Sequence, residues 1–169
     1  MLYIWARIAK SSITLRVYEL YCGAVKKRCI TEGCYGLITM FISNFSPRFY
    51  ETDAFGHVNN TVVTGWFETA REPIFRIFTP EMNVRELKLI LARVEVDFVA
   101  QIYYGSDVTV KTTIEKIGNS SFTVAHVALQ NDIVVANGKA VQVYFDFDSQ
   151  KSERIPDGYR VELEKHLEG

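Results

Sequence analysis

The sequence has few cysteines and no long apolar run, and each absence excludes a class of protein. Its three cysteines, Cys22, Cys29 and Cys34, fit neither a paired C-x-x-C zinc site nor the disulfide framework of a small secreted scaffold. Free thiols are typical of a reducing compartment, so we expect a cytoplasmic protein with no metal site. No apolar stretch approaches the ~18 to 20 residues that a transmembrane helix needs, so we also expect no membrane partner.

A large net charge is also absent. The 19 lysines and arginines nearly balance the 20 aspartates and glutamates, which gives a net charge of −1 and no reason to expect a nucleic-acid partner. The chain has 169 residues, of which 48% are hydrophobic and 23% charged. This length and composition suit one soluble domain with a core and are short for two domains.

The charges divide the chain into two parts. Residues 1–39 carry six basic and two acidic residues, whereas residues 40–169 carry thirteen and eighteen. One interpretation of the first part is a targeting segment, since its basic residues accompany Ser11 and Ser12. We favour the other, in which Met40 is the native start and residues 1–39 are an atypical, loosely structured N-terminal extension outside the native domain. The domain is then residues 40–169.

Helical spacing dominates the stretch between residues 61 and 78. Apolar residues recur there at steps of three and four, which predicts one long amphipathic helix that begins near Thr61. Pro73 removes a backbone hydrogen-bond donor and predicts a kink or an end at residues 69–72. Gly65 weakens a helix by roughly 1 kcal/mol, so we expect it where the helix closely approaches a sheet.

Extended spacing follows. From residue 87 onward apolar and polar side chains alternate, with turn residues between the runs. Long strands joined by tight turns predict an antiparallel meander, and the fold class is α+β with a sheet of about five strands. The expected strands are residues 41–50, 87–99, one that begins at 108, 122–129, and 133–147 with a bulge at Gly138, before a short helix from residue 155.

The stretch from Arg48 to Arg71 carries the residue types that acyl chemistry needs. A strand-like entry is followed by a polar loop, residues 52–60, and then by the apolar helix. Asp53 lies far enough before the helix for the loop to fold back toward the unpaired N–H groups of the helix N-terminus, where the helix dipole favours negative charge. A carboxylate opposite such an oxyanion site is what hydrolysis of an activated acyl group requires.

The same stretch carries a family resemblance. Residues 53–60, Asp-Ala-Phe-Gly-His-Val-Asn-Asn, and residues 66–71, Trp-Phe-Glu-Thr-Ala-Arg, resemble the signature loop and helix of the hotdog-fold acyl-CoA thioesterases, the 4-hydroxybenzoyl-CoA thioesterase family. The similarity covers about residues 41–160 and continues in order through residues 92–98, 104–107 and 117–122. It implies a single hotdog domain, in which the sheet wraps around the central helix, and a thioesterase activity.

The resemblance also implies roles for the loop residues. Asp53 falls on the family's catalytic carboxylate and would attack the thioester carbonyl or activate water, although an Asp at such a place also commonly forms an Asx-turn. Asn60 would donate its backbone N–H to the oxyanion, with Gly56 shaping the loop, and its side chain or that of Asn59 would cap the helix. His57 would act as a base, position water or serve as a structural residue.

Glu68 is a further candidate on the helix. It is either a second carboxylate, as in some related hotdog enzymes, or an ion-pair partner of Arg71 or Arg48. Three departures from the family pattern, at Val63, Ala100-Gln101 and Asn119, make the pocket shape and the coenzyme affinity the least transferable properties.

A second group of residues matches the place where the family contacts coenzyme A. It is the turn formed by Gly118, Asn119, Ser120 and Ser121, with Lys116, Lys139 and Arg93 as candidate phosphate partners. The same turn residues also fit an ordinary hairpin. Coenzyme A would be part of the substrate, and no other cofactor is required.

The expected function is hydrolysis of an acyl-CoA thioester to a free carboxylic acid and coenzyme A. The alternatives are an acyl-carrier-protein thioesterase and a non-catalytic subunit that binds acyl thioesters. We expect a homodimer or a tetramer, because a single hotdog leaves an edge strand and an apolar face open, and because the family places its active site at the dimer interface. A pocket lined by Trp66, Phe55 and Phe98 would take the acyl or aryl group.

Overall fold

A computed structural model describes residues 39–168 of the chain. The predictions for the N-terminal extension and its cysteines therefore lie outside the described residues. The elements, in chain order, are β1 (Phe41–Phe45), the 3-10 helix η2 (Phe49–Glu51), α2 (Asn60–Ala70), α3 (Glu72–Phe78), β2 (Leu89–Phe98), β3 (Val108–Ile117), β4 (Ser121–Gln130), β5 (Ile133–Asp146), β6 (Lys151–Ser152) and α4 (Asp157–Glu164).

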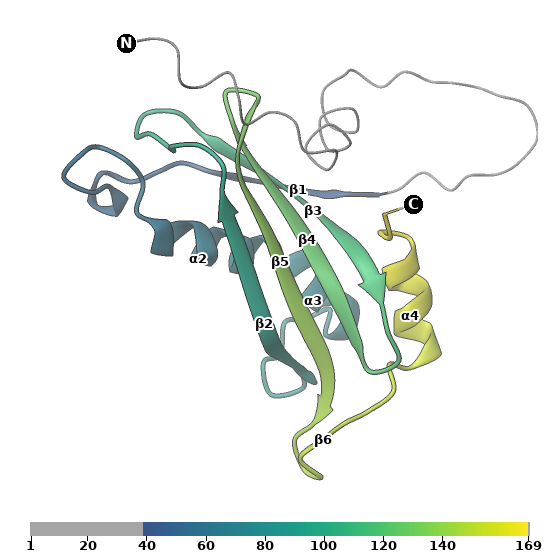
Figure 1. The fold of residues 1–169 in the computed structure, drawn as a ribbon. Coiled ribbons are helices and arrows are strands. Elements are labelled where there is room, and N and C mark those ends of the chain that lie inside the picture. The colour runs from purple at the N-terminus through teal and green to yellow at the C-terminus, as the bar shows by residue number, and fades with distance from the viewer. Residues whose placement is uncertain (1–38, 169) are drawn as a thin grey trace, which may run out of the picture. The chain divides into compact units, whose positions relative to one another are not determined.

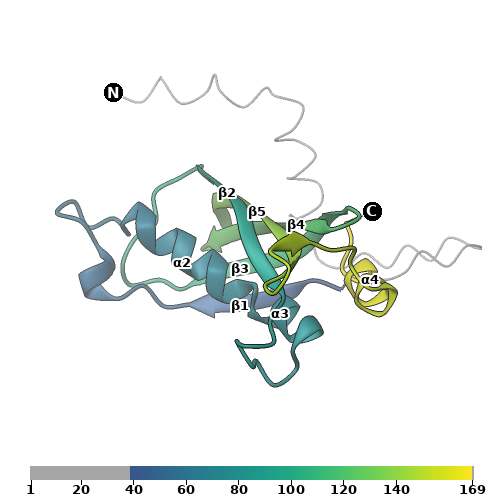
Figure 2. The same ribbon diagram turned by 90° about the horizontal axis from the view of Figure 1, so that it is seen from below.

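The strands form one antiparallel sheet in the order β1-β3-β4-β5-β2, and the short β6 extends it beside the end of β5. Figures 1 and 2 show α2 and α3 together on one face of this sheet. The α+β class and the hotdog arrangement, a curled antiparallel sheet around a central helix, are confirmed. The sheet has six strands rather than about five, because β6 adds a two-residue strand.

The first strand is shorter than predicted. β1 ends at Phe45, and residues 49–51 form a 3-10 turn instead of continuing the strand. Pro47 has no N–H to donate to a strand ladder, and the backbone N–H of Arg48 donates to Glu51 Oε2 at 2.7 Å, which closes the turn. The chain is thereby directed away from the sheet before the polar loop begins.

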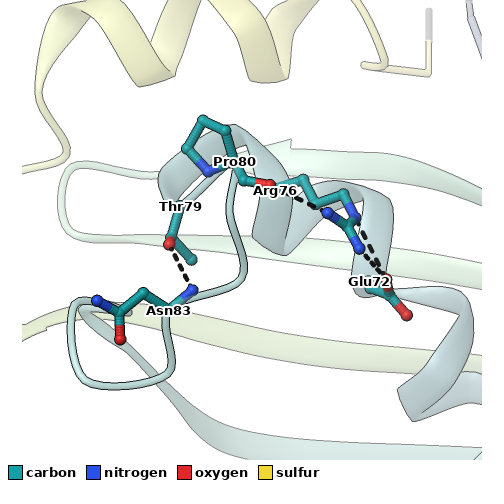
Figure 3. Close-up of polar contacts among 5 residues, drawn as sticks. All are labelled: Glu72, Arg76, Thr79, Pro80 and Asn83. Carbon is teal, nitrogen blue, oxygen red and sulfur yellow. Dashed lines mark hydrogen bonds and ion pairs between the residues drawn. The ribbon is translucent and has the colours of Figure 1, made fainter.

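The predicted break in the helix is confirmed. α2 ends at Ala70 and α3 starts at Glu72, with Pro73 in the first turn of α3, where a missing N–H costs nothing. The exit from α3 is held by the polar contacts in Figure 3: Arg76 bridges Glu72 and the carbonyl of Pro80, and the N–H of Asn83 donates to Thr79 Oγ1.

The core lies between the helices and the sheet. The buried face of α2 packs against the inner side chains of β3, β4 and β5, and a second cluster joins α3 and α4 to the other end of the sheet. The buried residues of α2 are Val63, Trp66, Phe67 and Ala70. The three- and four-residue spacing seen in the sequence is thus the spacing of the buried face.

Two glycine predictions are wrong. The close approach of helix and sheet that was expected at Gly65 occurs at Gly138 instead. Gly138 is regularly paired with Val96 and His126 and forms no bulge; a Cβ there would lie 2.5 Å from the ring of Phe67, so it is Gly138 that permits close helix–sheet approach. Gly65 has no atom within 4 Å of a Cβ placed on it and faces open space. The helix therefore tolerates its weakest helix former on an exposed side.

The ring of His126 lies under α2 and is fully buried. It stacks on Phe67 with centroids 4.9 Å apart, its Nδ1 lies 2.9 Å from Thr112 Oγ1, and its Nε2 has no hydrogen-bond partner among residues 39–168. Burial, and secondarily the charge of the buried Arg71, lower the pKa of His126 to about 3. The side chain is therefore neutral in the folded protein at neutral pH.

This neutral histidine makes a prediction about acid stability. The unfolded chain protonates His126 near pH 6.5 and the folded chain only near pH 3. The contribution of the neutral side chain to the free energy of unfolding is therefore complete above pH 6.5 and is lost as the pH falls toward 3. Between pH 7 and 4.5, His126→Gln should lose about 2.5 kcal/mol less of its free energy of unfolding than the unsubstituted protein does. Urea unfolding at both pH values measures this difference; equal losses would contradict it.

Candidate active site

The polar loop before α2 is held by hydrogen bonds within the loop and by one to the segment that precedes β3. The backbone N–H of Asp53 donates to the carbonyl of His57 at 2.8 Å, and that of Gly56 donates to the carbonyl of Asp53 at 3.1 Å. Gly56 has φ +79°, a conformation that glycine adopts without strain. The N–H of Val58 then donates to the carbonyl of Ile102 at 2.8 Å, which fixes the loop beside the segment that precedes β3.

The carboxylate of Asp53 is held from inside this loop. Its Oδ1 accepts from the N–H of Phe55 at 2.8 Å and from that of His57 at 3.1 Å, which is the Asx-turn geometry. These backbone donors, chiefly that of His57, hold the pKa of Asp53 below its usual value. The group is therefore ionised at neutral pH, exposed, and has only one oxygen committed to the loop.

His57 lies beside the second oxygen. Its Nδ1 is 4.0 Å from Asp53 Oδ2, too far for a direct hydrogen bond and close enough for an electrostatic contact. The ring packs edge-on against Tyr103, with centroids 5.2 Å apart, and stacks near Phe55. The loop thus presents a carboxylate oxygen and an imidazole side by side at the surface.

The start of α2 lies directly after the loop. The helix begins at Asn60, one residue earlier than predicted, and Asn59 is its N-cap: Asn59 Oδ1 accepts from the N–H of Thr61 at 3.1 Å. The structure shows no acceptor within residues 39–168 for the backbone N–H of Asn60. A free N–H at the positive end of a helix dipole can bind an anionic oxygen.

The turn predicted to contact coenzyme A lies elsewhere. It joins the end of β3 to β4, whereas the loop is hydrogen-bonded to Ile102, in the segment before the start of β3, and Figure 1 shows the two at opposite ends of the sheet. The carbonyls of Gly118, Asn119 and Ser120 accept from Arg160, Ile155 and Tyr144, so this turn is anchored to the C-terminal segment and β5. One chain does not bring the two predicted groups together.

The candidate phosphate partners are also differently engaged. Lys139 pairs with Glu115 and Arg93 with Glu95, while Lys116 is exposed. Glu68 is exposed as well. Burial lowers the pKa of Arg71 and the charge of Glu68 only partly opposes this, and no ion pair joins the two side chains in the described structure.

Sequence reasoning missed a cleft of about 760 Å³ beside α2. It is open to solvent and is lined by β1, the segment through η2, and the flank of the helix that carries Gly65. Of the three residues predicted to line an acyl pocket only Trp66 lies in it, since Phe55 and Phe98 are exposed elsewhere. The signal that was available is Gly65, a residue that weakens the helix and has no packing reason to be there.

The fold and this loop define a class, the thioesterases with a hotdog domain. The family model of the Thioesterase-like superfamily matches residues 47–163, and the chain belongs to this superfamily.

Three similar proteins are described as thioesterases or as a CoA hydrolase. A solved structure of a predicted thioesterase from Bacillus stearothermophilus is 47% identical, with a TM-score of 0.75, and the match covers 77% of this chain and 98% of that one. A thioesterase from Thermus thermophilus, solved with coenzyme A and Zn, is 29% identical with a TM-score of 0.66 over 72% and 95% of the two chains. The 1,4-dihydroxy-2-naphthoyl-CoA hydrolase of Prochlorococcus marinus is 26% identical over 72% of this chain and 84% of its own length.

Two features are absent from residues 39–168. None of the helices in this part of the chain is both long and apolar enough to span a membrane. The same residues contain no group of three or more His, Cys, Asp or Glu side chains placed to hold a metal ion.

The cap assignment gives a direct test of how the helix start is held. Asn59→Ala should lower the free energy of unfolding by about 1 kcal/mol, because it leaves the N–H of Thr61 without its side-chain acceptor. Asn60→Ala is the matched control, since the Asn60 side chain makes no cap contact, and it should change stability by less than about 0.5 kcal/mol. Chemical denaturation of both variants measures the difference; a larger loss for Asn60→Ala would contradict the assignment.

Proposed function

We propose that the protein hydrolyses an acyl-CoA thioester to a carboxylic acid and coenzyme A. The observation that carries the proposal is the loop, which holds an ionised Asp53 carboxylate a few residues before the unpaired N–H of Asn60 at the start of α2. Relatives that bind coenzyme A or hydrolyse a CoA thioester support coenzyme A as the carrier.

The chemistry follows from these groups. The N–H of Asn60 and the helix dipole polarise the thioester carbonyl and stabilise the tetrahedral oxyanion. Asp53 Oδ2, which is free of the loop hydrogen bonds, either attacks the carbonyl carbon or takes a proton from the attacking water, and His57 beside it orients that water. Collapse of the intermediate breaks the carbon–sulfur bond, and coenzyme A leaves as a thiolate that is then protonated. If Asp53 is the attacking group, the product of this collapse is an anhydride with Asp53, and water then cleaves it to release the carboxylic acid and restore the carboxylate.

The coenzyme site requires a second subunit in this proposal. The β3–β4 turn lies far from the loop of its own chain, so a partner subunit would supply it. The exposed edge of β2 supports a homodimer: in the described residues β2 pairs with β5 along one edge only, and it carries half-exposed apolar side chains. Those side chains are Leu91, Val94 and Phe98, followed by Val99. Unpaired strands with exposed apolar residues favour pairing with another copy.

The proposal predicts a loss of turnover without a loss of structure. Asp53→Asn keeps an Oδ1 acceptor for the N–H groups of Phe55 and His57, so the loop should stay closed, but it removes the negative charge. Thiol release from a panel of short, medium, long and aromatic acyl-CoA esters should fall by about 100-fold or more in kcat. The matched control is Asp148→Asn, at an exposed turn near β6, which should keep the unsubstituted rate.

The other outcomes of this assay are informative. Activity of Asp53→Asn near that of the unsubstituted protein would remove Asp53 from the mechanism. Turnover of acyl-carrier-protein thioesters but of no CoA ester would identify the carrier as protein. No turnover of any thioester by a folded dimer, together with tight binding of a non-hydrolysable acyl-CoA analogue, would identify a binding subunit.

A further inference from the structure

The loop before α2 lies against a segment that precedes β3, and the position of the loop depends on that segment. The backbone N–H of Val58 donates to the carbonyl of Ile102 at 2.8 Å, and His57 and Tyr103 face each other in an isolated antiparallel bridge. Val58 and Ile102 are both buried in the core cluster beneath α2. Whatever holds residues 102–106 therefore also holds the loop.

A buried glutamine of the sheet holds this segment. Gln130 is the last residue of β4 and is only 4% exposed. Its Oε1 accepts from the N–H of Tyr103 at 2.9 Å, and its Nε2 donates to the carbonyls of Tyr103 and Ser106, each at 2.8 Å. In the part of the chain that the structure describes, it is the one side chain of the sheet that hydrogen-bonds to residues 102–106.

These three contacts require an amide. One backbone N–H needs an acceptor and two carbonyls need donors, and a glutamine side chain carries both kinds of group at its end. The contacts also decide which atom of the amide is oxygen, because the opposite orientation would place its oxygen against two carbonyls. A carboxylate of the same length could accept but could not donate, and an apolar side chain would leave all three backbone groups without this partner.

The contacts continue from the sheet to the carboxylate of the loop. Gln130 belongs to β4, which is the middle strand of the sheet and pairs with β3 on one side and β5 on the other. On the other side of the segment, the ring of Tyr103 packs edge-on against that of His57. The N–H of His57 in turn donates to Asp53 Oδ1. An unbroken series of direct contacts thus joins the middle of the sheet to the proposed reaction centre.

We propose that Gln130 is a positioning residue for thioester hydrolysis: through residues 102–106 it holds His57 and Asp53 where they can act on the thioester carbonyl. It touches neither the substrate nor the reacting atoms and acts through geometry alone. This inference rests on the proposed function and adds to it a residue from outside the loop. Because misplacing a reacting group by about 1 Å can lower a rate by about 100-fold, the effect should fall on kcat.

The test removes the amide and keeps the length of the side chain. Gln130→Met loses all three hydrogen bonds to the segment. Gln142→Met is the matched control, because Gln142 is also a buried glutamine of the sheet, 2% exposed. It pairs with Phe122 near the β3–β4 turn, at the end of the sheet away from the loop, and no hydrogen bond joins it to residues 102–106 in the described structure.

The first readout needs no substrate. Hydrogen exchange measured by NMR compares the protection of the Val58 N–H with that of Val124 in the interior of β4, and an NMR titration follows the Asp53 carboxyl group. In Gln130→Met the protection of Val58 should fall by about 10-fold or more relative to Val124. The pKa of Asp53 should rise toward its usual value, because the N–H of His57 is the main group that lowers it. The control should change neither quantity.

The second readout is thiol release from the acyl-CoA ester that the unsubstituted protein hydrolyses fastest. Gln130→Met should lower kcat by about 10-fold or more for the same amount of folded protein, with a change in KM of less than about 3-fold. Gln142→Met should keep both constants. A role in stability alone would reduce the amount of folded protein and would not separate kcat from KM in this way.

The remaining outcomes separate the two proposals. Unchanged Val58 protection and an unchanged Asp53 pKa in folded Gln130→Met would overturn the positioning role, as would equal effects in Gln142→Met. A loosened loop with an unchanged kcat would also overturn it, while leaving thioester hydrolysis in place. If the unsubstituted protein hydrolyses no thioester, the proposed function fails, and the exchange and titration data still decide whether Gln130 holds the loop.

A second variant covers the case in which Gln130→Met does not fold. Gln130→Glu keeps an acceptor for the N–H of Tyr103 and, when ionised, loses both donor contacts, so it should show the same changes in both readouts. Failure of both variants to fold would identify Gln130 as a requirement for stability and would overturn the positioning role.

Discussion

The contact between the Phe67 ring and the bare backbone of Gly138 is the constraint on which the rest of the structure depends. Any side chain at position 138 would overlap that ring, so the contact sets how closely α2 lies against β4 and β5. The same ring stacks on His126 from the neighbouring strand, which fixes the rotation of the helix about its own axis. The rotation in turn decides that Val63 and Ala70 are buried and that Gly65 faces the cleft.

The position of α2 also fixes where its N-terminus lies. The loop before it is held in place by its own contacts. Hydrogen bonds within the loop and to the segment before β3 leave the Asp53 carboxylate little freedom. The hydrogen bonds that orient this carboxylate are the ones that lower its pKa, so one set of contacts supplies both geometry and charge. The Asx-turn and the catalytic role, which are alternatives when only the sequence is considered, are compatible here because they use different oxygens.

The sequence predicted what depends on local pattern. The helix was predictable from its apolar spacing, its break from Pro73, and the thioesterase superfamily from the residues of the loop. The parts that were missed depend on contacts between distant segments. Gly138 lies against a ring from α2, whereas Gly65 faces open space. The neighbouring residues in the sequence do not distinguish these two glycines, so the close contact was predicted at the wrong one.

The acyl pocket of Trp66, Phe55 and Phe98 stays a prediction, because it depends on contacts between distant segments. Trp66 lines the cleft beside α2, and Phe55 and Phe98 are exposed in the described structure. The early end of β1 at Phe45, which opens the cleft, followed from a single proline and a short 3-10 turn. The buried His126 and Arg71 give no sequence signal, because polar residues in a strand or helix are ordinarily exposed.

The central claim is that the Asn60 N–H and the Asp53 carboxylate act on the same thioester carbonyl. A crystal structure of the full chain with a non-hydrolysable acyl-CoA analogue tests it most directly. The account predicts that the carbonyl oxygen accepts from the N–H of Asn60 at about 2.7 to 3.1 Å, with Asp53 Oδ2 facing the carbonyl carbon or a water beside it. A carbonyl bound away from the start of α2, or an Asp53 carboxylate turned from it, would contradict the account.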